Sequence, residues 1–264
     1  MIKAVAVDMD GTFLNKQNDY DRPRFEQLFN RMQEKGVRFI VASGNQYYQL
    51  RSFFSSYQGI TYVSENGALV FNDQGLQQER HFTKELTEKI ITFLVEGDHD
   101  LEFVTCGIKS SYMLESASED FKKFARIYSY RLEELADYAE LPDDPIVKFA
   151  LDVEVEKTYE IAEHLNKAFA GEITAVTSGH GSIDIIIPGV TKGRAIKNLL
   201  EEWGIEPNEL AAFGDANNDL EMLALTEHSY AMKECSPDVL ATAKKQAPSN
   251  NESGVLQVVE TLLA

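Results

Sequence analysis

The sequence predicts an α/β protein whose parallel-sheet core is split by an inserted α+β domain. Near both ends of the chain, short apolar runs alternate with helical patterns, which indicates a parallel sheet with crossover helices. In the middle of the chain this alternation gives way to clustered strands and hairpin signals, which indicates a different type of layer. We therefore place the core at residues 1–82 and 188–264 and the insertion at residues 83–187. A single continuous sheet is the alternative.

The first part of the chain follows a β-α-β-α-β order. Its strands are short, apolar, β-branched runs of the kind that a sheet buries on both faces, at residues 2–7, 37–42 and 60–63. The helices between them are expected at residues 24–35 and 46–55. The first helix has apolar residues at helical spacing and ends at Gly36. A hairpin follows, with strands at residues 68–71 and 76–82.

The insertion and the return to the core are predicted from the same signals. In the insertion we expect helices at residues 84–95, near 121–127 and at 156–170, and strands, with antiparallel pairing, at 101–106, 110–114, 146–153, 173–176 and 182–187. Pro188-Gly189 marks the return to the core. The alternation then resumes, with helices at residues 192–203, 218–225 and 237–244 and strands at 210–213 and 229–232.

Composition restricts the class of protein. The 264 residues include 25 basic and 43 acidic side chains, a net charge of −18, which disfavours nucleic acid and anionic membrane surfaces as partners. The two cysteines, Cys106 and Cys235, lie far apart and are expected to be reduced core thiols, not a disulfide or a zinc site. No apolar run approaches the length of a membrane span, and no signal peptide is visible. We expect a soluble, cytoplasmic protein that is a monomer or a weak homo-oligomer.

Acidic residues follow two of the expected core strands. Asp8-Met9-Asp10-Gly11-Thr12 comes after the first strand, and Gly214-Asp215-Ala216-Asn217-Asn218-Asp219 follows the strand at 210–213. Ligands collect at the carboxyl ends of parallel strands, so these carboxylates are expected to converge. Carboxylates about 4 Å apart repel by roughly 1–4 kcal/mol, and a divalent cation would offset that repulsion. An all-oxygen ligand set favours Mg²⁺ over Zn²⁺. An EF-hand is excluded because its glycine and glutamate positions are not met.

Two further segments could bind an anion. Ser43-Gly44-Asn45 lies where a strand turns into a helix, so that a hydroxyl and backbone N–H groups could hold a phosphate. Ser43 could equally be an ordinary helix cap. Lys192 lies in the first turn of a helix, where it opposes the helix dipole, which suggests a nearby anion. Taken alone, the position favours a solvated surface lysine.

In this order the four segments resemble the motifs of the haloacid dehalogenase superfamily of phosphotransferases. Those motifs are DxDGT, a strand-end Ser/Thr, a helix-start Lys, and GDxxND. The resemblance covers the whole chain, because the insertion is similar to the large cap of the Cof-type sugar phosphatases. It is strongest at residues 8–14, 42–50 (ASGNQYYQL), 65–68 (ENGA) and 183–188. It implies a Rossmann-like core with an α+β cap. One departure is Asn45, because many Cof-type relatives carry arginine there; substrate specificities of those relatives are not carried over.

The resemblance also implies roles for individual residues. Asp8 would be the nucleophile, and Asp10 the general acid for the leaving alcohol and then the base for water. Mg²⁺ would be bound by Asp8, the backbone carbonyl of Asp10, and Asp215. The residues expected to hold the phosphate are Ser43, Gly44, Lys192 and Asn218. Asp219 would orient Lys192 or a metal-bound water, with Thr12 in a supporting place.

The expected activity is therefore the Mg²⁺-dependent hydrolysis of small phosphorylated metabolites, chiefly sugar phosphates. The superfamily's ATPases typically carry threonine at the position of Asp10, so the aspartate favours hydrolysis of phosphate esters. The rivals are a phosphomutase on the same scaffold and a non-catalytic, Mg²⁺-responsive signalling module. The insertion is expected to act as a lid whose loops at residues 106–109 and 177–180 could touch the substrate. Tyr47 and Tyr48 could line the same space or pack in the core.

Overall fold

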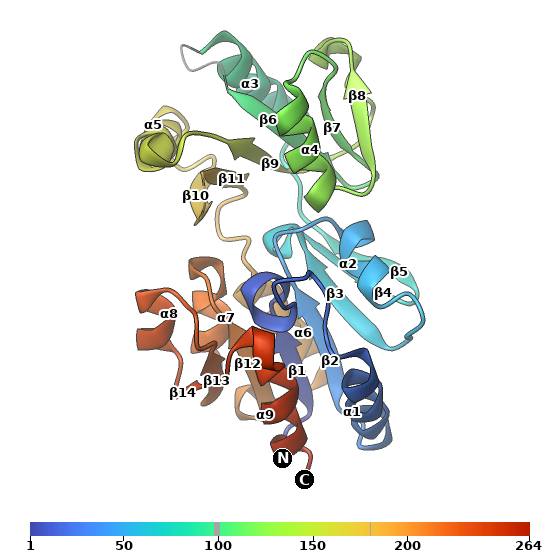
Figure 1. Ribbon diagram of the computed structural model, residues 1–264. Coiled ribbons are helices and arrows are strands. Elements are labelled where there is room, and N and C mark those ends of the chain that lie inside the picture. The colour runs from blue at the N-terminus through green and yellow to red at the C-terminus, as the bar shows by residue number, and fades with distance from the viewer. Residues whose placement is uncertain (98–100, 180) are drawn as a thin grey trace. The chain divides into compact units, whose positions relative to one another are not determined.

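The computed structural model describes residues 1–97, 101–179 and 181–264, which form two compact units (Figure 1). Unit 1 comprises Met1–Gln78 and Thr191–Ala264, and unit 2 comprises Glu79–Val190. The chain thus leaves unit 1 a few residues before the expected boundary at 82 and returns to it a few residues after 188. Each unit has its own sheet.

Unit 1 is built on an eight-stranded sheet with the order β14-β13-β12-β1-β2-β3-β4-β5. The strands are β1 (Ala4–Val7), β2 (Arg38–Ala42), β3 (Ile60–Ser64), β4 (Leu69–Asn72), β5 (Gly75–Glu79), β12 (Leu210–Gly214), β13 (His228–Ala231) and β14 (Lys245–Gln246). Strands β14 to β3 pair in parallel, and β4 is antiparallel to β3. The predicted parallel-sheet core is confirmed.

Helices cover both faces of this sheet. They are α1 (Arg22–Glu34), α2 (Tyr47–Phe53), α6 (Lys192–Trp203), α7 (Leu220–Ala224), α8 (Pro237–Thr242) and α9 (Gly254–Leu262). Alternate residues of a strand point to opposite faces, so Ala4 and Ala6 of β1 pack in one core cluster with Ile196 of α6. Phe25 of α1 packs against Phe39 of β2 on the other face. This double burial explains why the central strands read as continuous apolar runs.

The register of the central strands decides where the site forms. Val7 of β1 lies between Val41 of β2 and Phe213 of β12. The three strands therefore end at the same level, and the segments that follow them share one edge of the sheet. Those segments are the ones that carry Asp8, Ser43 and Asp215.

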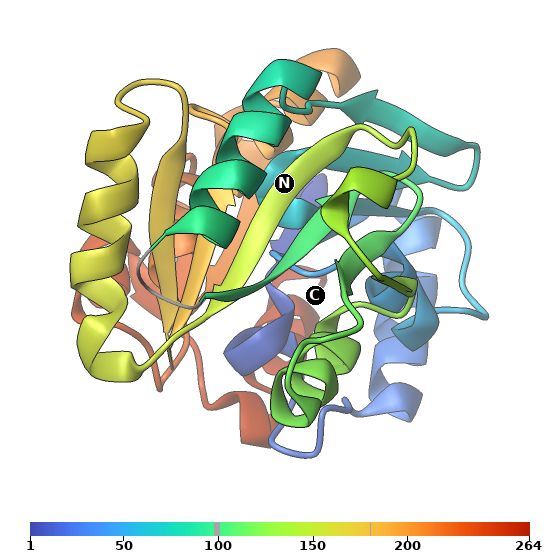
Figure 2. The same cartoon turned by 90° about the horizontal axis from the view of Figure 1, so that it is seen from above.

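The described part of unit 2 contains a sheet with the order β10-β11-β9-β6-β7-β8. Its strands are β6 (Glu102–Gly107), β7 (Ser111–Leu114), β8 (Leu132–Leu135), β9 (Ile146–Asp152), β10 (Thr174–Gly179) and β11 (Ser182–Ile186). All neighbours pair antiparallel except β7 and β8. The helices are α3 (Lys84–Glu96), α4 (Glu119–Tyr128) and α5 (Thr158–Ala168). Helices α3 and α5 share an apolar cluster with one face of the sheet. Figure 2 draws the same ribbon seen from above. The predicted α+β layer is confirmed.

In the described parts of the chain, no helix combines the length and the apolar character that crossing a bilayer requires. Cys106 and Cys235 are free thiols; Cys106 is buried, as predicted for a core thiol, whereas Cys235 is only partly buried.

Candidate active site

The chain turns sharply after β1, and the turn sets the position of Asp8. The backbone N–H of Asp8 continues the sheet pairing by donating to the carbonyl of Phe213, at 3.1 Å. Residues Met9–Phe13 then form a single wide helical turn. The carboxylate of Asp8 is buried at the centre of the sheet edge, whereas Asp10, two residues later, is exposed.

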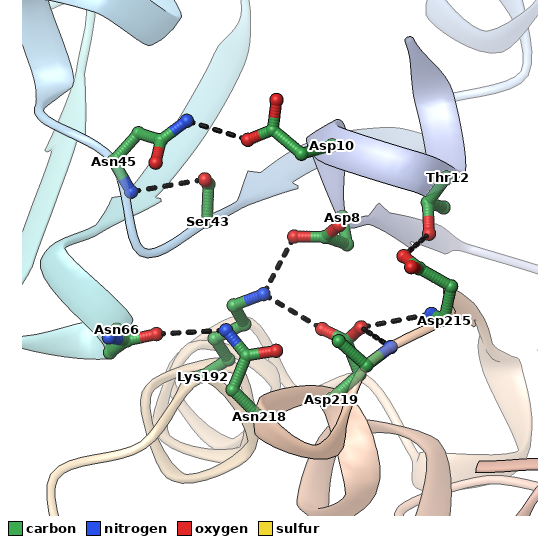
Figure 3. Close-up of polar contacts among 11 residues, drawn as sticks. Asp8, Asp10, Thr12, Ser43, Asn45, Asn66, Lys192, Asp215, Asn218 and Asp219 are labelled. Atoms are coloured by element: carbon green, nitrogen blue, oxygen red, sulfur yellow. Dashed lines mark hydrogen bonds and ion pairs between the residues drawn. The ribbon is translucent and has the colours of Figure 1, made fainter. Parts of the chain in front are cut away.

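Lys192 is completely buried between two carboxylates (Figure 3). Its Nζ donates to Oδ1 of Asp8 at 2.6 Å and to Oδ1 of Asp219 at 2.8 Å. It is the first residue of α6, whose N-cap Thr191 accepts a hydrogen bond from the N–H of Arg194. Burial alone would lower the pKa of Lys192, but the carboxylates of Asp219 and Asp8 outweigh it and raise that pKa above its ordinary value. Lys192 is therefore charged, and it is not a surface residue.

Asp219 uses both of its oxygens within the protein. Oδ1 accepts the ammonium of Lys192, and Oδ2 accepts the backbone N–H groups of Asp215 and Ala216 at 3.0 and 3.2 Å. The carboxylate thus fixes the loop after β12 and orients the lysine at the same time. A role for Asp219 in the reaction stays a prediction.

Asp215 faces the turn after β1. Its Oδ1 accepts the hydroxyl of Thr12 at 2.6 Å. A Cβ atom at Gly11 would collide with Oδ2 of Asp215, so a glycine is required where the two loops meet. Burial raises the pKa of Asp215 to about 6, and the hydrogen bond from Thr12 opposes that rise. Burial likewise raises the pKa of Asp8 well above its usual range, although Lys192 lowers it.

The carboxylates of this edge fit a divalent cation. Ligand atoms of Asp8, Asp215 and Asp219 lie within 4.8 Å of one another. Three carboxylates face one ammonium, so two negative charges are left without compensation when all three are ionised. Both oxygens of Asp219 already accept hydrogen bonds, from Lys192 and from two backbone amides, so Asp8 and Asp215 are the carboxylates better placed to hold the metal. Hard oxygen ligands of this kind suit Mg²⁺.

The segment after β2 supplies the other side of the site. Ser43 is buried, and its Oγ accepts the backbone N–H of Asn45 at 3.1 Å. Helix α2 begins only at Tyr47, with Gln46 as its N-cap, so Ser43 is not the helix cap. The side chain of Asn45 reaches across to Asp10, with Nδ2 donating to Oδ2 at 2.7 Å (Figure 3). Gly44 lies between Ser43 and Asn45 in this turn.

The turn between β3 and β4, residues Glu65–Gly67, joins the site, although sequence reasoning gave it no role. All three residues have positive φ, at 50°, 56° and 99°. The N–H of Asn66 donates to the carbonyl of Ser43 at 3.1 Å, and its Oδ1 accepts Nδ2 of Asn218 at 3.1 Å. The amide of Asn218 keeps a second N–H for a ligand. Two signals were available: the Asn-Gly pair, which predicts only a turn, and the family resemblance at residues 65–68, to which no role was attached.

The remaining candidates are Tyr47, Tyr48 and the two predicted loops of the insertion. The ring of Tyr47 stacks on Phe71 at 3.8 Å between centroids, which is the packing role considered as its alternative. Gly107, in the loop at residues 106–109, lies in unit 2 beside the buried carboxylate of Asp144. His180, in the other predicted loop, lies outside the described residues. That these loops touch a substrate stays a prediction.

Comparisons with known proteins support one family. The model of the haloacid dehalogenase-like hydrolases matches residues 5–259. The 5-amino-6-(5-phospho-D-ribitylamino)uracil phosphatase YbjI of Escherichia coli is 39% identical over 263 residues, covering 99% of this chain and 96% of the relative. The HMP-PP phosphatase of Cronobacter sakazakii is 24% identical and covers 91% of this chain and 88% of the relative. The crystal structure of SMU.1108c from Streptococcus mutans UA159 superposes with a TM-score of 0.94 at 37% identity, covering 100% of this chain and 99% of that chain.

Proposed function

The chain belongs to the haloacid dehalogenase-like hydrolases, and from that premise we propose that it is a Mg²⁺-dependent phosphatase of sugar phosphates and related phosphorylated polyols. The substrate class rests on the relative YbjI, whose name specifies a phosphorylated ribityl chain. A ribityl phosphate is a monoester on a polyhydroxylated carbon chain, as sugar phosphates are. We extend that chemical class, and not the particular uracil compound, to this chain.

The observation that carries the proposal is the buried Asp8–Lys192–Asp219 arrangement. Asp219 holds Lys192, and Lys192 holds one oxygen of Asp8 at 2.6 Å, so the carboxylate of Asp8 has a fixed direction. A fixed carboxylate can attack phosphorus and form an aspartyl phosphate, which divides hydrolysis into two easier steps. The ammonium of Lys192 stabilises the negative charge of the phosphate as the nucleophile approaches.

A bound Mg²⁺ would be held by Asp8, Asp215 and the backbone carbonyl of Asp10, and would offset the charge of the phosphate. The protein residues then divide the remaining work. Ser43 and Asn218 lie at the same edge as Asp8 and can donate hydrogen bonds to phosphate oxygens. Asp219 is left to orient Lys192.

Asp10 has the properties of a general acid and base. Desolvation by the surrounding protein raises the pKa of its carboxyl group, while the hydrogen bond from Asn45 opposes that rise. Its exposure gives it access to a leaving alcohol and to water. We assign it proton donation to the leaving oxygen and then proton removal from the attacking water.

A panel of phosphorylated metabolites, assayed for phosphate release with Mg²⁺ and with excess chelator, tests the proposed function. We expect phosphate release from pentose and hexose phosphates and from an aryl phosphate with Mg²⁺, and loss of that release in chelator. No bisphosphate activator should be needed. Transfer of the phosphoryl group back to the sugar, or full activity in excess EDTA, would contradict the proposal.

A further inference from the structure

We propose that Asn45 is a positioning residue that fixes the carboxyl group of Asp10 for proton transfer to the leaving oxygen. This inference rests on the proposed function, because it needs Asp10 to be the general acid. It gives a role in the reaction to a residue that neither the charge cluster nor the phosphate-binding set includes.

The two side chains meet across adjacent strand ends. Asp10 lies in the turn after β1, and Asn45 lies in the segment after β2, its parallel neighbour. Nδ2 of Asn45 donates to Oδ2 of Asp10 at 2.7 Å, and Figure 3 shows the amide pointing from its own turn toward the carboxylate. The contact is short for an N–H···O bond, as expected when the acceptor is a carboxylate.

Asn45 is held more firmly than the residue it contacts. Its backbone N–H donates to Oγ of Ser43 at 3.1 Å, and its carbonyl accepts the N–H of Glu65 at 3.2 Å. The backbone of Asn45 is therefore attached on both sides, and its side chain has only two rotatable bonds. Asp10 is exposed, with extended backbone angles inside its turn. The firmly held amide therefore limits rotation of the exposed carboxyl group.

The contact also distinguishes the two oxygens of Asp10. Oδ2 accepts the hydrogen bond from Asn45, so Oδ1 is left to carry the proton. In the first step an oxygen of Asp8 forms a bond to phosphorus as the bond between phosphorus and the leaving oxygen breaks; the electron pair of the broken bond goes to the leaving oxygen, which takes the proton from Oδ1 of Asp10. In the second step the oxygen of water forms a bond to phosphorus while Oδ1 of Asp10 takes a proton from that water; the bond between phosphorus and Asp8 breaks, and its electron pair restores the Asp8 carboxylate. The carboxyl group ends in the state in which it began.

The effect of losing this contact depends on the leaving group. An alkoxide is a poor leaving group and needs the proton as it departs, whereas a nitrophenolate departs with little help. We therefore expect Asn45→Ala to lower kcat/KM for a pentose 5-phosphate by on the order of 10- to 100-fold, a part of the 10²- to 10⁴-fold that general acid catalysis supplies. For p-nitrophenyl phosphate the expected loss is less than about threefold. A purely structural role would lower both values alike.

The experiment measures kcat/KM for both substrates with Mg²⁺ in the wild type, Asn45→Ala, Asp10→Asn and the double variant. In the Asp10→Asn background, Asn45→Ala should cause no further loss with the pentose phosphate, because the group it positions is already gone. Asn72→Ala is the matched control, since Asn72 makes its side-chain bond to Gln74 in the β4–β5 hairpin. If Asn45→Ala does not fold, Asn45→Asp keeps the shape but loses the donor, and the same leaving-group bias is expected from it.

Equal losses for the two substrates, or an additive loss in the Asp10→Asn background, would overturn the role of Asn45. If Asp10→Asn shows a leaving-group bias that Asn45→Ala lacks, the role of Asn45 fails alone. If Asp10→Asn shows no such bias, the general-acid role of Asp10 fails, and the role of Asn45 fails with it.

Discussion

At the scale of single residues, Lys192 is the side chain on which the charges of the site converge. It is fully buried, yet it is charged because Asp8 and Asp219 each accept a hydrogen bond from it. The Lys192 ammonium neutralises two carboxylates, and in the proposed mechanism it also stabilises the phosphate. Variants can separate these two roles. Removing a buried carboxylate can compensate for the lost charge of Lys192 in the fold, but it cannot restore an interaction with the phosphate.

We predict that Lys192→Met lowers kcat/KM for an aryl phosphate by about 10²-fold or more, the scale of losing one transition-state donor. It should also lower the free energy of unfolding by about 3–5 kcal/mol, because two carboxylates remain buried without their cation. Steady-state kinetics and urea denaturation measure the two effects.

The double variant Lys192→Met/Asp219→Asn serves as the control. It removes one of the stranded charges and should recover part of the stability but none of the activity. Recovery of activity in the double variant would show that Lys192 acts only through the fold.

At the scale of elements, the turn Glu65–Gly67 connects segments that are distant in sequence. It bonds to the backbone of Ser43 and Asn45 and to the side chain of Asn218. Gly67 lies against the backbone of Thr191, where α6 begins, and a Cβ there would collide with the Thr191 carbonyl oxygen. The position of Lys192 therefore depends on a glycine in another loop.

We predict that Gly67→Ala lowers both stability and kcat/KM, because it must displace the first turn of α6. Gly75→Ala is a matched control, since Gly75 has φ of 100°, against 99° for Gly67, but a Cβ added to it would meet no atom within 4 Å. Both variants should lose about 1–2 kcal/mol from the left-handed backbone. Only Gly67→Ala should lose more than that, together with activity; equal effects in thermal unfolding and kinetics would contradict the role of the turn.

The hairpin turn between β6 and β7 is held by the buried carboxylate of Asp144. Asp144 accepts the backbone N–H groups of Ile108, Lys109 and Ser110, and the hydroxyl of Tyr112 at 2.9 Å. Three adjacent backbone donors on one buried carboxylate hold the turn in a single conformation. This turn includes part of the loop at residues 106–109 that the sequence predicts to touch the substrate.

We predict that Asp144→Asn speeds amide hydrogen exchange at residues 107–112, because an amide side chain replaces one acceptor oxygen by a donor. If this loop contacts the substrate, Asp144→Asn should weaken discrimination among sugar phosphates while activity on an aryl phosphate changes little. Hydrogen-exchange mass spectrometry and competition assays measure these effects. Faster hydrogen exchange together with unchanged discrimination among sugar phosphates would show that this loop does not determine substrate specificity.

At the scale of the whole molecule, the sequence predicted most of the elements and the convergence of the motifs. Strands such as β1 and β12, buried on both faces, appear as apolar runs, and α6 has the bounds predicted for it. Strand β8 was missed because Leu132–Leu135 contains two exposed glutamates and no apolar run. Strand β14 has only two residues, and α9 lies in the C-terminal segment, where no helix was predicted.

Only those residues of the site that belong to sequence motifs could be predicted. Asp8, Asp215 and Lys192 follow strands or begin a helix, so the order of elements predicts their meeting place. The roles of Gly67 and Asp144 could not be predicted, because they depend on contacts with backbone far away in the sequence. Contacts between residues so far apart produce no recognisable pattern among neighbouring residues of the sequence.

Mass spectrometry of a quenched reaction can identify the residue that receives the phosphoryl group, which we expect to be Asp8. Asp10→Asn protein, mixed with Mg²⁺ and an aryl phosphate, should accumulate an aspartyl phosphate, because phosphoryl transfer needs little acid help and hydrolysis lacks its base. We predict the added phosphoryl group on Asp8, and none in Asp8→Asn protein treated in the same way. A label on any other residue, or normal turnover by Asp8→Asn, would show that Asp8 is not the nucleophile.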